Sequence, residues 1–224
     1  MDISRNYGGH TDPGGAAIRR ELDGLSISKV SVGPMDNNAY LLVCAQTNEA
    51  LLIDAAAEPD RLADLVGAAD DRPALRHVVT THQHWDHWQA LGAVAGMFET
   101  RQIAHPLDAG ELPIPMDELV EDGATVRFGE LELEVLHLRG HTPGSIALLF
   151  RGADRPHLFT GDSLFPGGPG KTNSPEEFGS LLTDLEKRVF DRLPDETWVY
   201  PGHGDDTTVG AERPSLPEWR DRGW

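Results

Sequence analysis

The chain has 224 residues, of which 37 are acidic and 19 basic, and a formal net charge of −18. This length is sufficient for one domain with a sizeable core. So acidic a chain disfavours nucleic acid and membrane partners, because phosphate-rich surfaces are bound through clustered Lys and Arg side chains. No apolar run approaches the length needed to cross a bilayer, and the first residues lack the apolar centre of a secretory signal. With Cys44 as the single cysteine, no internal disulfide can form, so we expect a cytoplasmic protein.

The N-terminal half of the chain predicts strands and two helices. Residues 1–20 are rich in glycine and polar groups and lack periodicity, so we expect a mobile N-terminal tail there and a single domain over residues 21–224. Leu62, Leu65 and Val66 recur at helical spacing and predict a helix over 58–69. A second helix is expected at 89–97. Short apolar runs predict strands at 26–32, 39–45, 50–53 and 75–81.

The C-terminal half adds five strands and one long helix. Ser174 is a suitable N-cap and Pro175 a suitable first helical residue, so a helix is predicted from there to about residue 193. Gly129 suits a hairpin turn between two strands. The strands expected in this half are 125–128, 131–138, 145–150, 157–160 and 198–200. Runs of strands interrupted by single helices predict one α/β domain with two sheets between outer helices.

Residues 82–87, which read HQHWDH, bring three histidines and one aspartate into six positions. Imidazole and carboxylate groups are the ligands that a borderline divalent ion such as Zn²⁺ prefers. Side chains alternate along the end of a strand, so His82 and His84 can face one metal ion. Asp86 and His87, where a helix starts, can face a second ion. The run therefore predicts half of a metal site.

Three further ligand candidates each follow a predicted strand and a glycine, which lets the backbone approach closely. They are His141 in GHT, Asp162 in GDS and His203 in GHG. Their recurrence in the same setting, each at the end of an apolar strand, is a second signal for a site at which several strand ends meet.

The HxHxDH run followed by GH, GD and GH resembles the metallo-β-lactamase superfamily over residues 25–210. The resemblance implies a four-layer αββα sandwich with two divalent metal ions, Zn²⁺ being expected and Fe or Mn²⁺ being alternatives. It also implies the following ligand sets: His82, His84 and His141 for one ion, Asp86, His87 and His203 for the other, and Asp162 as the bridge.

Within the superfamily, the GDSLF and GxGK stretches after residue 160 are similar to glyoxalase II, a thioesterase. The resemblance implies that Lys171 binds a carboxylate of the substrate, although a solvated loop lysine fits the pattern equally well. Two departures are Asn173, where that family has tyrosine, and only 21 residues after His203, where it has a helical domain. We therefore expect a small acyl-thiol substrate more than glutathione itself.

The expected reaction is hydrolysis, with Asp86 and Asp162 as the catalytic carboxylates. A water that bridges two divalent ions ionises near neutral pH and can attack a thioester carbonyl. The main alternative is a sulfur dioxygenase, in which one iron is held by residues matching His82, His141 and Asp162. A lactonase, which keeps all seven ligands, is a second alternative. The sequence leaves the oligomeric state open.

Overall fold

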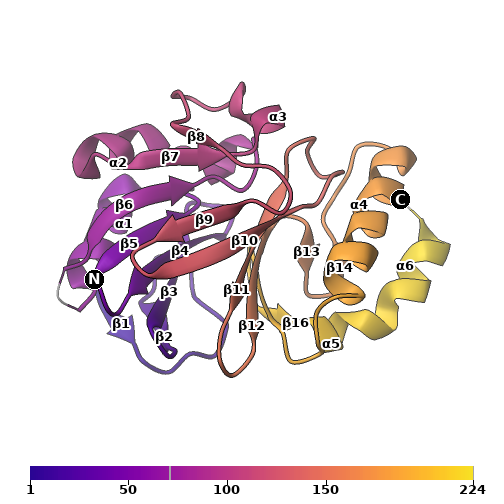
Figure 1. The fold of residues 1–224 in the computed structure, drawn as a ribbon, viewed down its shortest axis with the longest axis horizontal. Helices are drawn as coiled ribbons and strands as arrows, with labels where there is room; N and C mark the ends of the chain where they lie inside the picture. Colours follow the sequence, from indigo (N-terminus) through magenta and orange to yellow (C-terminus); the bar gives the residue numbers. More distant parts are fainter. Residues whose placement is uncertain (71, 224) are drawn as a thin grey trace.

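A computed structural model describes residues 1–70 and 72–223 of the chain. Figure 1 shows two β-sheets between outer helices, with α1 and α2 on one side and α4 and α6 on the other. The predicted αββα sandwich is therefore confirmed. Within the described residues, no helix is long and apolar enough to cross a membrane.

The first sheet has eight strands, and their spatial order is the same as their order in the chain. The strands pair antiparallel from β2 to β5 and parallel from β5 to β8. The strands are β1 (Ile3–Ser4), β2 (Ala17–Glu21), β3 (Leu25–Val32), β4 (Asn37–Cys44), β5 (Glu49–Ile53), β6 (Ala74–Val79), β7 (Arg101–Ala104) and β8 (Glu118–Leu119).

The second sheet has six strands in the order β16-β15-β12-β11-β10-β9. Its strands are β9 (Thr125–Phe128), β10 (Leu131–His137), β11 (Ile146–Arg151), β12 (Pro156–Gly161), β15 (Trp198–Pro201) and β16 (Thr207–Thr208). β12 and β15 run parallel, so their C-terminal ends lie at the same edge of the sheet. A separate hairpin pairs β13 (Leu164–Phe165) with β14 (Gly168–Pro169).

Helices cover the outer face of each sheet because each has one apolar side. On the first sheet, α1 (Pro59–Ala68) and α2 (Leu91–Phe98) pack through residues such as Leu65 and Val94. On the second sheet, α4 (Pro175–Leu185) and a π-helical turn to Phe190 pack beside α6 (Leu216–Arg222). The shorter helices are α3 (Pro106–Ala109) and α5 (Val209–Glu212).

The core between the sheets is an apolar layer with an aromatic centre. Phe159 stacks on Tyr200 with ring centroids 4.5 Å apart, and Tyr40 meets both rings edge-on. The Tyr40 hydroxyl donates to the carbonyl of Pro201 at 2.6 Å. This contact joins the two sheets at the end of β15, two residues before His203.

The predicted tail over residues 1–20 was wrong. β1 and β2 lie in this segment and extend the first sheet, so the boundary expected after residue 20 falls inside a strand. The apolar signal of β2 is weak because Arg19 occupies a buried position. Its guanidinium donates to Asp70 at 3.1 Å and to Ser26 at 2.9 Å. These bonds offset the free-energy cost of removing the charge from water.

The apolar stripe of α4 provides a test of the packing. Leu181 is fully buried against the second sheet, so Leu181→Ala removes apolar contacts and leaves a cavity. We expect the free energy of unfolding to fall by about 2–5 kcal/mol. Met97 in α2 is 50% exposed, and Met97→Ala should change stability by about 0.5 kcal/mol or less. Equal losses in urea denaturation of the two variants would contradict this arrangement.

Candidate metal centre

The seven predicted ligands meet at one edge of the sandwich, where β6, β10, β12 and β15 end. The loop after β6 carries two of them, and the 3₁₀ turn Trp85–His87 that follows carries two more. The other three strands each supply one side chain from the loop that follows. In chain order the seven are His82, His84, Asp86, His87, His141, Asp162 and His203.

A first group of three imidazoles points ring nitrogens at one another. His82 Nε2 lies 3.1 Å from His84 Nδ1, which lies 2.9 Å from His141 Nε2. Burial and the neighbouring His87 hold the pKa of His82 well below its usual value, and burial also lowers the pKa of His141. These two rings are therefore neutral at pH 7 and offer lone pairs to a cation.

A second group combines a carboxylate with two imidazoles. His203 Nε2 lies 3.2 Å from His87 Nε2 and 3.3 Å from Asp86 Oδ2. Burial lowers the pKa of His87, but the charges of Asp162 and Asp54 outweigh it and raise the pKa to about 10. The pKa of His203 is likewise raised to about 10, against burial, by hydrogen bonds to Asp162 and Asp86. This position therefore has the negative potential that attracts a cation.

Asp162 lies between the two groups. Its Oδ2 is 3.5 Å from His141 Nε2 in the first group and 3.3 Å from His203 Nε2 in the second. Its Oδ1 is buried without a hydrogen bond, 3.3 Å from His87 Nε2. A buried carboxylate oxygen without a donor is costly, and a cation on either side would satisfy it. The donor set, with imidazole nitrogens and shared carboxylate oxygens, fits two borderline divalent ions.

Two buried residues that the sequence analysis missed orient the ligands. Asp54 follows β5 directly, and its Oδ2 accepts from His87 Nδ1 at 2.8 Å and from Thr81 Oγ1 at 2.8 Å. Asn37 at the start of β4 donates from Nδ2 to Asp86 Oδ2 at 2.9 Å. An aspartate at the end of a buried strand was a signal that could have identified Asp54, whereas Asn37 carries no such signal.

Main-chain carbonyls fix the ring orientation of two further ligands. His141 Nδ1 donates to the carbonyl of Lys171 at 2.6 Å, and His203 Nδ1 donates to the carbonyl of Met35 at 2.9 Å. With Nδ1 held by a carbonyl, Nε2 is the nitrogen of each ring that can bind a cation at the centre.

Asp108 in α3 joins the two loops of the first group. It is buried, and its carboxylate accepts from the amide of Gln83 at 2.9 Å, from Thr142 Oγ1 at 2.6 Å and from the amide of Gly144 at 2.7 Å. Gln83 stands between His82 and His84, and Thr142 follows His141. Asp108 therefore fixes the separation of these ligands without contacting the centre.

The glycines beside the single ligands are required sterically. A Cβ on Gly202 would stand 2.1 Å from Asp162 Oδ1, and one on Gly161 would stand 2.6 Å from Thr81 Oγ1. Gly161 also has φ +48°, a backbone conformation that residues with a side chain rarely adopt. The close approach expected from the GD and GH pattern is confirmed at both positions.

The other five histidines lie outside these groups, as expected from the sequence. In the part of the chain that the structure describes, none of them forms a cluster of three metal-binding side chains. They are His10, His77, His105, His137 and His157.

Comparison with known families agrees with this geometry. Residues 32–203 match the family model of the metallo-beta-lactamase superfamily. The chain belongs to this superfamily. A hydroxyacylglutathione hydrolase from Polaromonas sp. is 34% identical over 168 residues, which are 75% of this chain and 62% of that protein. The chain thus spans less than two thirds of the length of this relative.

Two solved structures are similar to the chain. ETHE1 from Myxococcus xanthus is 31% identical with a TM-score of 0.74, covering 85% of this chain and 83% of that one. TTHA1623, solved in a di-iron-bound form, is 30% identical with a TM-score of 0.70, covering 85% of this chain and 98% of that one. Superfamily membership and the two side-chain groups together indicate a dinuclear divalent metal site.

Asp54 allows a test of ligand orientation. Asp54→Asn keeps the shape but removes the charge that holds His87, so we expect the ion bound by the second group to bind about 10–100-fold more weakly. Calorimetric titration of metal-free protein with Zn²⁺ measures this change. Asp117→Asn is the control, since that carboxylate accepts from the amide of Gln102 in β7. Unchanged affinity in Asp54→Asn would assign Asp54 to folding alone.

The raised pKa values make metal binding depend on pH. In the metal-free chain the raised pKa values of His87 and His203, about 10 each, keep this pair of rings protonated at pH 7. An ion must displace a proton from the pair, so apparent affinity should rise with pH up to about 10 and at least one proton should be released per chain. Calorimetry in buffers of different ionisation enthalpy counts the protons. Affinity that is independent of pH between 6 and 9 would be inconsistent with cation binding at these rings.

Proposed function

We propose that the chain is a metal-dependent hydrolase that cleaves a small acyl-thiol ester. The observation that carries the proposal is the complete second group: His87 and His203 each lie 3.3 Å from a carboxylate oxygen of Asp162, and Asp86 lies 3.3 Å from His203. A dinuclear centre suits hydrolysis because two ions can share the charges of the nucleophile and the carbonyl oxygen. The similarity to hydroxyacylglutathione hydrolase supports a thioester as the substrate.

Zn²⁺ is the proposed metal, because its borderline character suits a mixed histidine and aspartate set. The same ligands accept iron or manganese, and the di-iron form of TTHA1623 supports iron as the alternative. When bound, two such ions would lower the pKa of a water molecule and polarise a carbonyl group.

The residues of the chain orient the reactants. Burial raises the pKa of Asp162, but the charge of His87 and a hydrogen bond from His203 outweigh it and hold the pKa well below its usual value. Hydrogen bonds from His203 and Asn37 have the same effect on Asp86, again against burial. Both carboxylates are therefore ionised at pH 7 and would accept hydrogen bonds from the attacking water. Hydrolysis by this route needs no serine or cysteine nucleophile.

Lys171 is proposed to bind a carboxylate on the thiol part of the substrate. Its main-chain carbonyl accepts a hydrogen bond from His141 Nδ1, so the backbone of this lysine lies beside the first group. Lys171 is exposed to solvent. An exposed ammonium group here can form a charge-assisted bond with an anion that enters from solvent.

Apolar side chains around the centre support an apolar acyl group. The main-chain carbonyl of Met35 accepts a hydrogen bond from His203, and Trp85 lies between His84 and Asp86 in the chain. These two apolar residues are 49% and 53% exposed. The ring of Phe165 lies 6.3 Å from the ring of His203. Exposed apolar side chains gain free energy when a ligand covers them, so these residues favour aliphatic acyl groups.

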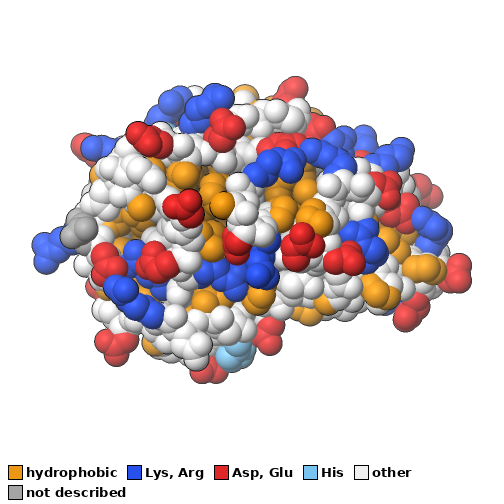
Figure 2. All heavy atoms as spheres, turned by 60° about the horizontal axis from the view of Figure 1, so that its bottom comes forward, with side chains coloured by type: hydrophobic (Ala, Val, Ile, Leu, Met, Phe, Trp, Pro, Cys, Tyr) orange, Lys and Arg blue, Asp and Glu red, His pale blue; other side chains and the backbone are white. Residues whose placement is uncertain are grey.

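A small molecule is the proposed partner, rather than nucleic acid or a membrane. Figure 2 shows one face of the molecule on which basic side chains lie beside acidic ones and apolar side chains. With a net charge of −18, the chain has a poor electrostatic match to phosphate backbones.

A sulfur dioxygenase is the second candidate, and the similarity to ETHE1 favours it. The two reactions differ in their need for oxygen. A thioesterase should release free thiol from an ester such as S-lactoylglutathione at the same rate under nitrogen and in air. Oxygen consumption with a thiol persulfide, together with no thiol release from esters, would replace the hydrolase by the dioxygenase.

The role of Lys171 is tested by removing its charge. Lys171→Ala should raise KM for a carboxylate-bearing thiol ester about 10–100-fold, which corresponds to about 1.5–3 kcal/mol of charge-assisted bonding. An ester without the carboxylate should keep its KM. Lys187→Ala, at another exposed lysine, is the matched control. Equal KM changes with both esters, or none with either, would make Lys171 an ordinary surface residue.

A further inference from the structure

A fully buried lysine stands behind the second metal group. Lys29 in β3 is 0% exposed, and its Nζ donates to three acceptors at 2.7 Å: the carbonyls of Gly9 and Gly204 and Oδ1 of Asp206. A buried ammonium group is costly unless all its protons have acceptors. Here each proton has one, and the three acceptors lie on two segments that are far apart in the sequence.

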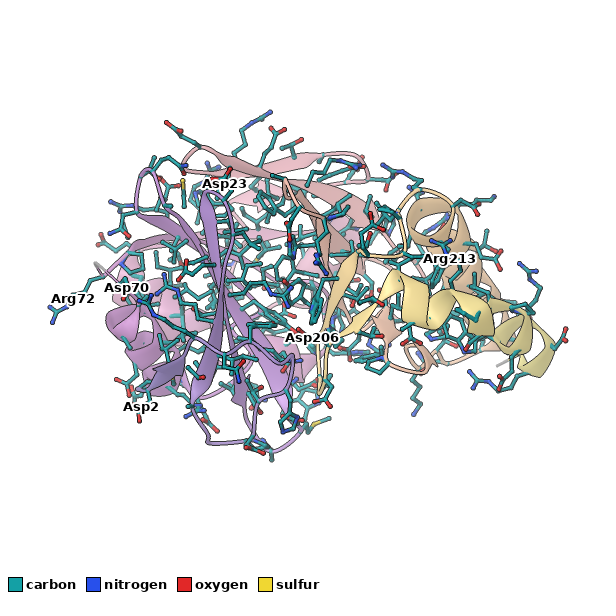
Figure 3. All side chains as sticks on the ribbon, turned by 90° about the horizontal axis from the view of Figure 1, so that it is seen from below. Asp2, Asp23, Asp70, Arg72, Asp206 and Arg213 are labelled. Atoms are coloured by element: carbon teal, nitrogen blue, oxygen red, sulfur yellow. The ribbon has the colours of Figure 1, made fainter. Side chains whose placement is uncertain are left out.

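One of these segments is the loop that carries His203. Gly204, the next residue, has a carbonyl that accepts from both Lys29 and the side chain of Asn38. Asp206 accepts from Lys29 and also from the indole of Trp198 at 2.8 Å. Figure 3 shows Asp206 where the N-terminal half of the chain meets the C-terminal part of the second sheet. The loop is therefore fixed by residues other than the metal ligands.

The other segment is residues 7–10, which the sequence analysis assigned to a mobile tail. The hydroxyl of Tyr7 donates to Asp206 Oδ2 at 2.9 Å, and the carbonyl of Gly9 accepts from the amide of Asp206 at 3.1 Å. His10 Nδ1 lies 2.6 Å from Asp205 Oδ1. Contacts from Tyr7, Gly9 and His10 thus join this segment to Asp205 and Asp206 in the loop after His203.

We propose that residues 7–10, held by Lys29 and Asp206, position His203 and thereby set the affinity of the second metal group. His203 contacts the rest of the centre through Nε2, and the placement of its backbone depends on the 202–206 loop. A shift of this loop moves His203 away from Asp86 and His87, while the three imidazoles of the first group lie on other loops. Loss of the contact therefore weakens one ion selectively.

A matched pair of glycine substitutions tests the proposal. Gly9 has φ +84° and its Cβ would stand 3.1 Å from Asp206 Cβ, whereas Gly14 has φ +73° with nothing within 4 Å. Gly9→Ala and Gly14→Ala therefore impose similar backbone strain, but only the first pushes against the loop. Metal-free proteins are titrated with Zn²⁺ against a competing chelator, and His203→Ala identifies the binding step that belongs to the second group.

We expect Gly9→Ala to raise the dissociation constant of the second step about tenfold or more and to leave the first step unchanged. Gly14→Ala should match the wild type in both steps. Equal constants in Gly9→Ala and Gly14→Ala would overturn the proposal, as would an equal loss in both steps, which indicates general destabilisation. A wild-type chain that binds a single ion would overturn both this proposal and the dinuclear hydrolase.

The double variant Lys29→Met/Asp206→Asn tests the same contact if Gly9→Ala does not fold. It removes both charges together, so no buried charge is left without a partner, and the amide oxygen at position 206 can still accept from Tyr7 and Trp198. We expect the same selective loss of the second step, with the melting temperature of the metal-free protein measured in parallel. Unchanged affinity in the second step would show that Lys29 and Asp206 do not position His203.

Discussion

The carboxylate of Asp162 has to stand within reach of His141 on one side and of His87 and His203 on the other. These histidines come from different loops, so four strand ends from two sheets must meet at one edge. The sandwich meets this requirement because β12 and β15 are parallel neighbours and because the end of β6 faces them across the core. Gly202 has no side chain because Asp162 occupies the space that a Cβ would need.

Buried polar residues that are not themselves ligands hold this arrangement in place. Asp54 fixes His87 and Thr81, Asp108 ties the two loops of the first group, and Lys29 anchors the loop of the second. Each of these charged groups is surrounded by donors or acceptors, which offsets its desolvation. The chain thus uses charged groups at positions that apolar residues could fill, and these groups fix the geometry of the ligands.

Local patterns predicted the fold and the ligands because their signals are short in sequence. The HxHxDH run brings four candidate ligands into six residues, and the strand expected at 125–128 was confirmed to the residue. Asn37, Asp108 and Lys29 act on loops that are 20 or more residues away, so their roles depend on strand neighbours that no local pattern reveals. β2 was missed for a related reason, since the charge of the buried Arg19 is balanced by Asp70, which is distant in the sequence.

The central claim is that seven side chains hold two ions on either side of Asp162. Anomalous X-ray diffraction at the Zn²⁺ edge, on crystals of the metal-loaded protein, tests it most directly. Two anomalous peaks are predicted, one among His82, His84 and His141 and one among Asp86, His87 and His203, with Asp162 contacting both. A single peak in fully loaded crystals, or two peaks that Asp162 does not join, would contradict the account.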